Sequence, residues 1–114
     1  MLTYHETSNF RCLKLCLRCE PELEIFLRHL VSQRGLGREL ARSGGVRVYR
    51  VQASARQEPV EFLFLGPFFD RVVYLLACYR GSSCEPPSAA QEKVLRKLVH
   101  TVIKIVELEE LDAR

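Results

Sequence analysis

Long apolar runs are absent from this sequence. No stretch approaches the ~20 consecutive apolar residues that a helix needs to span a bilayer, which excludes a transmembrane helix. The first ten residues include His5 and Glu6 and lack the apolar segment of a secretory signal, so we expect a cytoplasmic protein with no membrane partner. Internal repeats and low-complexity tracts are absent as well.

The chain is also too short for many kinds of enzyme. Its 114 residues suit one compact domain, residues 1–114, and leave little room for a doubly wound nucleotide-binding fold. Apolar residues make up 47% and charged residues 27% of the composition, which is ordinary for a globular protein with a core. We therefore expect a single globular domain. We also expect no cofactor.

Cysteine is present in an odd number. Five cysteines without an export signal indicate a reducing compartment and free thiols. Cys12, Cys16 and Cys19 have the spacing of an iron–sulfur motif, but on a helix they share one face, where cysteine packs as a small apolar residue. We favour the core interpretation and expect no metal, because Cys78 and Cys84 also lack partners at metal-ligand spacing.

Positive charge is concentrated in the middle of the chain. Between Arg28 and Arg56 there are seven arginines and one acidic residue, Glu39, whereas Glu107–Asp112 contains four acidic residues and no basic one. Thirteen of the 17 basic residues are arginines, whose planar guanidinium can bind a phosphate through two hydrogen bonds. The basic region is therefore a candidate for phosphate or nucleic-acid binding.

The spacing of apolar residues predicts both helices and strands. The run 72–76 is apolar at every position, which is typical of a central strand covered on both faces. Ser88 and Gln91 form a capping-box pattern that opens a long helix. The predicted elements are a strand Leu2–Tyr4, helices Phe10–Leu17 and Pro21–Ser32, a basic linker Arg38–Gly45, strands Val46–Val51, Val60–Leu65 and Arg71–Tyr79, a loop 80–87 and a helix Ser88–Leu108.

These elements predict an α+β fold. The polar segment 52–59 and the pair Gly66-Pro67 indicate turns, so the strands between 46 and 79 form an antiparallel meander. We expect an antiparallel sheet, the short first strand plus this meander, packed by two N-terminal helices and the long C-terminal helix. Helix 10–17 is the least distinct of these, because its leucines also alternate as they do in a strand.

Residues along nearly the whole chain carry a family resemblance. They are Glu6-Thr7, Phe10, Leu36-Gly37, Ser43-Gly44-Gly45-Val46-Arg47, Arg50-Val51, Tyr74-Leu75-Leu76, Tyr79, Ser88, Gln91 and Leu95. Their order and spacing, with a glycine pair leading into an arginine-bearing strand, resemble the RelE/ParE toxin superfamily of toxin–antitoxin systems, and within it the HigB-like branch. The resemblance implies a RelE-like α+β fold over residues 1–114.

The resemblance also implies a function. Members of this family are mostly small endoribonucleases that cut messenger RNA on the ribosome, and a cognate antitoxin protein holds them inactive. In such a reaction the RNA 2′-hydroxyl attacks the adjacent phosphorus, and no metal is required. The expected partners are therefore mRNA, the ribosome and an antitoxin.

Site residues follow from the same resemblance. Arg47 would clamp the scissile phosphate, and Arg80 would stabilise the leaving side. Tyr79 would orient the 2′-hydroxyl, or deprotonate it if neighbouring cations lower the pKa of the phenol. The candidate catalytic residues are Arg47, Arg50, Tyr79 and Arg80, and the candidate RNA-binding residues are Arg38, Arg42, Tyr49 and Arg56.

Two positions leave the function open. Val48 and Gly81 stand where the family has lysines. An active ribonuclease toxin is one interpretation. A second is a catalytically degenerate toxin fold that binds RNA, the ribosome or an antitoxin, and a third is a gyrase inhibitor like members of the ParE branch.

The C-terminal helix has more apolar residues than one face can hold. Val99, Ile103 and Leu108 widen the stripe that faces the sheet. The stripe itself consists of Val94, Leu95, Leu98, Val102, Ile105 and Val106. We expect part of this helix to pack on a partner, either an antitoxin segment or a second copy in a homodimer.

Overall fold

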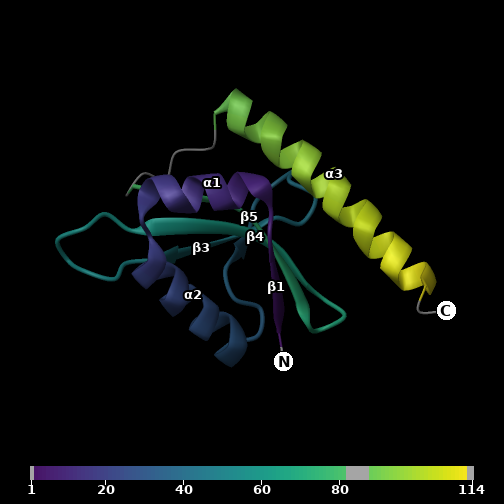
Figure 1. Ribbon diagram of the computed structural model, residues 1–114, viewed down its shortest axis with the longest axis horizontal. Coiled ribbons are helices and arrows are strands. Elements are labelled where there is room, and N and C mark those ends of the chain that lie inside the picture. Colours follow the sequence, from purple (N-terminus) through teal and green to yellow (C-terminus); the bar gives the residue numbers. More distant parts are fainter. Residues whose placement is uncertain (1, 82–87, 113–114) are drawn as a thin grey trace.

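One sheet lies between two layers of helices (Figure 1). The computed structural model describes residues 2–81 and 88–112. Within these ranges the elements are β1 Thr3–Glu6, α1 Ser8–Leu17, α2 Glu20–Ser32, β2 Arg38–Glu39, β3 Arg47–Val51, β4 Val60–Phe68, β5 Val72–Arg80 and α3 Ala89–Asp112. The strand order is β1-β5-β4-β3-β2. Helices α1 and α2 pack on one face of the sheet and α3 packs on the other, so the predicted α+β class is confirmed.

The sheet is mixed, and the prediction of a purely antiparallel sheet is wrong. Strands β2 to β5 pair with antiparallel neighbours, but β1 pairs with β5 in parallel, with Thr3 opposite Val72. A parallel pair needs a long crossover, and the chain from α1 to β4 supplies it. Residues 38–39, which we expected in a linker, form the short edge strand β2.

The turn between β4 and β5 lies after the predicted one. Gly66-Pro67 is inside β4, where a Cβ on Gly66 would lie 2.5 Å from the carbonyl oxygen of Val72. Glycine at φ +109° allows this close approach. Phe69 and Asp70, with φ of 55° and 58°, make the reversal, and two positive φ values are typical of a type I′ hairpin turn.

Helix α1 forms as favoured, but it turns a different face to the sheet than we expected. The Thr7 side chain caps it by accepting the Phe10 N–H at 3.2 Å, and Phe10 is buried. Cys12 and Cys16 are exposed, so the prediction that they pack in the core is wrong. Phe10, Leu13 and Leu17 form the face of α1 that packs on the core instead. Cys19 is buried, but it lies at the N-cap of α2.

Strand β5 is covered on both faces, as predicted. Val73 and Leu75 belong to the cluster under α1 and α2, whereas Tyr74 and Leu76 belong to the cluster under α3. All four side chains are buried. A functional site can therefore lie only where these two clusters leave part of a strand uncovered.

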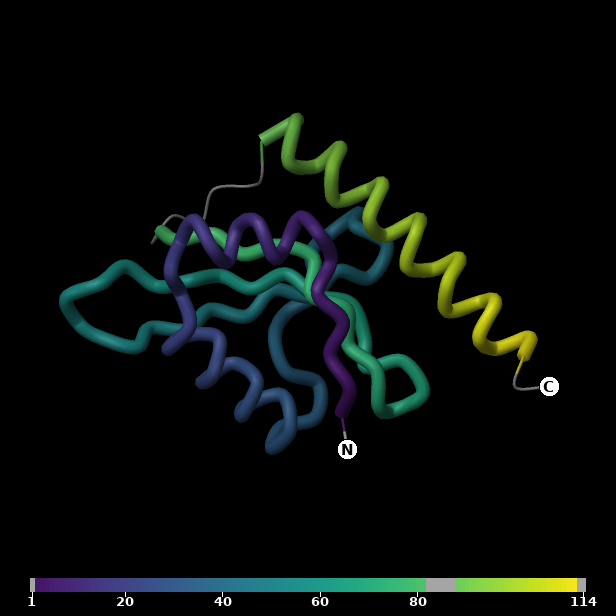
Figure 2. Tube along the Cα trace, viewed as in Figure 1, coloured from purple at the N-terminus to yellow at the C-terminus, as the bar shows by residue number. Residues whose placement is uncertain are grey.

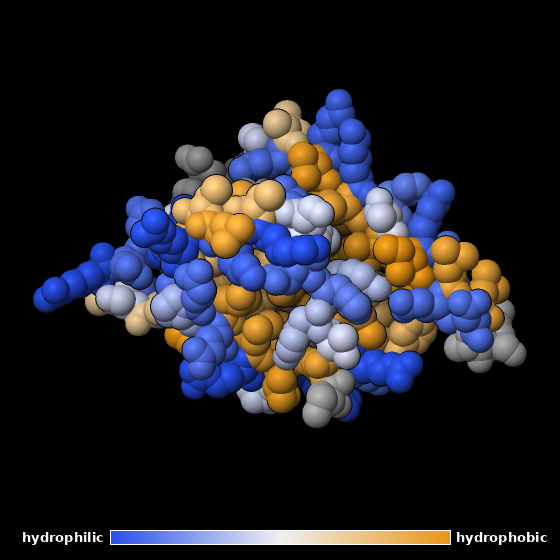
Figure 3. Space-filling view, in the orientation of Figure 1, coloured by the Kyte–Doolittle hydropathy of each residue, from blue (hydrophilic) through white to orange (hydrophobic). Residues whose placement is uncertain are grey.

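Helix α3 extends beyond the sheet that it covers (Figure 2). Its capping box is confirmed, because Ser88 Oγ accepts the Gln91 N–H at 3.2 Å and Gln91 Oε1 accepts the Ser88 N–H at 2.8 Å. Leu95 and Val102 are buried, but Leu108 is exposed, and apolar atoms follow the line of α3 to its C-terminal end (Figure 3). None of the described helices is long and apolar enough to cross a membrane. Most of the predicted loop 80–87, with Cys84, lies outside the described residues.

Candidate functional site

Strand β3 places its two candidate arginines on opposite faces of the sheet. Successive residues of a strand point to alternate faces. Val48 packs in the cluster under α3, whereas Val51 packs in the cluster under α1 and α2. Arg50 therefore lies on the face that α3 covers in part, the α3 face, and Arg47 lies on the opposite face, the α1–α2 face.

Arg47 is engaged by the backbone that follows α2. Its Nε donates to the Leu36 carbonyl at 2.9 Å, and its Nη2 donates to the carbonyls of Gly35 at 3.0 Å and Gly37 at 2.7 Å. Carbonyls of a loop need such donors, because the loop has no regular backbone partners. The guanidinium that we expected at the scissile phosphate thus fastens the α2–β2 connection to β3.

Arg80 is engaged in the same way at the end of β5. Its Nη2 lies 3.3 Å from Oε2 of Glu22, whose side chain is only 2% exposed, and 3.4 Å from the Leu17 carbonyl oxygen. Its Nη1 donates to the Glu58 carbonyl at 3.1 Å. A buried carboxylate needs a cationic partner, so Arg80 holds α2 against β5 on the α1–α2 face.

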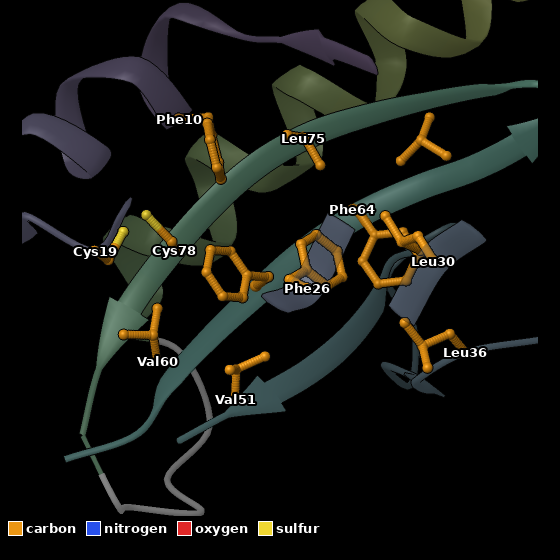
Figure 4. Close-up of a cluster of buried hydrophobic side chains, with 12 residues drawn as sticks. Phe10, Cys19, Phe26, Leu30, Leu36, Val51, Val60, Phe64, Leu75 and Cys78 are labelled. Atoms are coloured by element: carbon orange, nitrogen blue, oxygen red, sulfur yellow. The ribbon is translucent and has the colours of Figure 1, made fainter. Parts of the chain in front are cut away.

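Two buried thiols lie next to this ion pair. The sulfur atoms of Cys19 and Cys78 point toward each other in the core (Figure 4). The Cys78 thiol donates a hydrogen bond to Cys19, which lowers the pKa of Cys19 and, together with burial, raises the pKa of Cys78. Within the described ranges, no three histidine, cysteine or acidic side chains are grouped as metal ligands would be.

Three side chains form a row across the α3 face. Arg50 on β3 is directly opposite Glu61 on β4, and Glu61 is directly opposite Tyr79 on β5. Arg50 Nη2 donates to Glu61 Oε1 at 2.9 Å. The Arg50 side chain is 41% exposed and that of Glu61 is 20% exposed, while Tyr79 is half-buried. We call this set the sheet row; it brings together two of the four candidate catalytic residues, Arg50 and Tyr79.

Tyr79 is in an environment that keeps its hydroxyl protonated. Burial raises the pKa of Tyr79, and negative charge on the neighbouring Cys78 would raise it further. The condition for Tyr79 to act as a base, a pKa lowered by neighbouring cations, is therefore not met. A protonated phenol donates a hydrogen bond, so this residue is suited to act as a donor rather than as a base.

The candidate RNA-binding arginines are all exposed. Arg38 on β2 is opposite Val48, which places it on the α3 face with the sheet row. Arg42 borders a cavity of about 460 Å³, between residues 40–43 and the first turns of α3, that Arg96 also lines. Arg56 lies in the loop between β3 and β4. These side chains are free to reach solvent at several points around the sheet.

Tyr49 is the exception among the RNA-binding candidates. It lies on the α1–α2 face, where its ring stacks on Phe26 with centroids 5.9 Å apart. Its hydroxyl oxygen lies 2.6 Å from Nδ1 of His29. These contacts with α2 indicate a packing role.

Sequence reasoning missed two acidic residues that organise these contacts. Neither Glu61 nor Glu22 is among the site residues predicted from the sequence. The signal for Glu61 is available in the sequence, because a hairpin that pairs Val51 with Val60 must also pair Arg50 with Glu61. Nothing in the sequence pairs Glu22 with Arg80, which are 58 residues apart.

Comparison with known proteins identifies no family. No family model and no curated protein matches the chain. The functional argument therefore rests on the sheet row, on the exposed arginines near it and on the resemblance of the sequence to the RelE/ParE toxins.

Proposed function

We propose that this protein is a toxin of the RelE/ParE type that cuts ribosome-bound mRNA by metal-independent attack of the RNA 2′-hydroxyl on the adjacent phosphorus. The observation that supports this best is the sheet row, in which Arg50 and Tyr79 flank one position of β4 on the same face. Both residues belong to the motifs that resemble the toxin family. Arg38 extends the basic character of this face to the sheet edge.

The two retained residues supply complementary chemistry. A guanidinium presents paired donors to a phosphate and stabilises the negative charge that develops on its oxygens, which is the role of Arg50. Tyr79, whose phenol stays protonated, donates a hydrogen bond to the phosphate or to the departing 5′-oxygen. Arg47 and Arg80 take no part in this revised site, because their donors serve the fold.

Exposed arginines outside the row supply affinity for RNA. Arg42 and Arg56 are solvent-exposed at separate points of the surface, where they can contact phosphates without reading bases. Binding through such contacts weakens steeply as salt rises. A cognate antitoxin would then act by covering this basic surface.

Cleavage of ribosome-bound mRNA by the purified chain tests this proposal. We expect new 5′ ends in wild type, a rate about 100-fold lower in Arg50→Ala and a smaller loss in Tyr79→Phe. Arg11→Ala, an exposed arginine on α1, is the matched control and should cut at the wild-type rate. A folded wild-type chain that leaves the message intact would contradict the proposal.

A second candidate function is binding without cleavage. The observation that favours it is that Arg47 and Arg80, two of the four expected catalytic residues, donate to backbone carbonyls and to a buried carboxylate. A protein of this kind would bind RNA or ribosomes with a steep salt dependence and would leave the message intact. The same cleavage assay, combined with a binding measurement, separates the two functions.

A further inference from the structure

We propose that Glu61 is the proton acceptor of the cleavage reaction, an inference that rests on the proposed function and adds a residue to its site. Glu61 is the middle residue of the sheet row. Residues directly opposite on adjacent strands have Cβ atoms about 4.5–5.5 Å apart, so Arg50 and Tyr79 both lie within reach of one ribose-phosphate unit at Glu61.

The chemistry of the row leaves only one group for this role. An arginine stays protonated in proteins, so Arg50 cannot take a proton. Burial raises the pKa of Tyr79, which opposes the phenolate form that a base requires. The carboxylate of Glu61 accepts protons, and its partial exposure of 20% leaves it accessible to a substrate.

An acidic residue repels the phosphates of RNA, but the ion pair between Glu61 and Arg50 offsets this repulsion. Arg50 Nη2 lies 2.9 Å from Glu61 Oε1, so the two opposite charges are adjacent and largely offset each other at the distance of an approaching phosphate. The same hydrogen bond orients the carboxylate on the sheet. A positioned carboxylate beside a phosphate-binding guanidinium is the arrangement that in-line attack by a 2′-oxygen requires.

The proposed step balances without a metal or a co-reactant. The 2′-hydroxyl proton passes to a carboxylate oxygen of Glu61 as the 2′-oxygen bonds to phosphorus. The bond from phosphorus to the 5′-oxygen breaks, and this oxygen takes the proton of the Tyr79 hydroxyl. The products are a 2′,3′-cyclic phosphate and a 5′-hydroxyl end. Water then accepts the Glu61 proton and reprotonates Tyr79.

The variant Glu61→Gln tests this role, because it keeps the size of the side chain and removes the base. We expect a cleavage rate lower by about 10²–10⁴-fold, with RNA affinity equal to or higher than that of wild type because a negative charge is lost. Glu61→Asp, which keeps the carboxylate, should recover part of the rate. Glu58→Gln, an exposed glutamate in the preceding loop, is the matched control and should cut at the wild-type rate.

The outcomes separate this inference from the proposed function. A wild-type chain that never cuts contradicts both. A wild-type chain that cuts, together with Glu61→Gln cutting equally fast, overturns the role of Glu61 alone. Loss of cleavage and of RNA binding to the same degree in Glu61→Gln, with Glu61→Asp no better, would show that Glu61 only supports the sheet and would also overturn it.

Discussion

Arginine side chains serve two different purposes in this protein. Arg47 and Arg80 donate to carbonyl oxygens and to Glu22, and so join helices to the sheet. Arg38 and Arg50 lie on the α3 face, where a ligand can approach. A guanidinium has five donors that suit carbonyls and phosphates equally, so residue type alone does not separate the two roles. The role of each arginine depends on the face of the sheet on which its side chain lies. The buried residues next to it on the strand identify that face.

The structural role of Arg47 predicts a loss of stability in Arg47→Ala. We expect its free energy of unfolding to fall by about 1–3 kcal/mol, because the carbonyls of residues 35–37 lose their donor. Arg38→Ala, at an exposed position of the neighbouring strand, should change it by less than about 0.5 kcal/mol. Equilibrium urea unfolding of both variants measures the difference. Equal stabilities of the two variants would contradict the structural role of Arg47 and favour the earlier prediction that it binds the scissile phosphate.

The individual residues of the candidate site were only partly predictable from the sequence. Arg50 and Tyr79 were predicted by the family resemblance, and the structure places them on one face. Arg80 was predicted from the same resemblance, but it follows Tyr79 directly on β5, and adjacent strand residues point to opposite faces. Glu61 needed the pairing register of the hairpin, which links residues that are distant along the chain.

The local elements were predictable because their signals are local. The helical spacing in α2 and the capping box of α3 involve residues a few positions apart, and both are confirmed. The direction of β1 was not predictable, since its pairing with β5 joins residues 69 positions apart. The face of α1 was misassigned because three cysteines share helical spacing, whereas Phe10 is the side chain that fills the core.

Glycine at position 66 marks a contact between elements, and Gly66→Ala tests it. We expect a loss of at least about 3 kcal/mol in unfolding free energy, because the new Cβ would lie 2.5 Å from the backbone oxygen of Val72 at φ +109°. Gly35→Ala, at φ +70° with nothing within 4 Å, should lose only about 1–2 kcal/mol. Thermal or urea unfolding compares them. Similar losses would mean that backbone conformation alone, without the close approach, explains both.

For the whole molecule, α3 carries more apolar surface than the domain covers. Leu108 is 63% and Leu111 is 62% exposed, near the end of the helix that projects beyond the sheet (Figure 2). From residue 89 to Lys104 the helix has four basic residues and one acidic residue, and the remainder has four acidic residues. This order opposes the helix dipole, which favours acidic residues at the N-terminus and basic residues at the C-terminus. An antiparallel second copy would set each acidic end beside a basic one.

This arrangement predicts a homodimer through α3, with twice the 13.2 kDa mass of the chain. Leu108→Glu should weaken the dimer at least about 10-fold, because it places a charge in the apolar contact and adds to the acidic end. Leu15→Glu changes a leucine that is 70% exposed on α1, and should leave the dimer unchanged. Size-exclusion chromatography with light scattering over a range of concentrations measures both. A folded wild-type chain that stays monomeric at about 100 µM would mean that a different partner, such as an antitoxin segment, covers this helix.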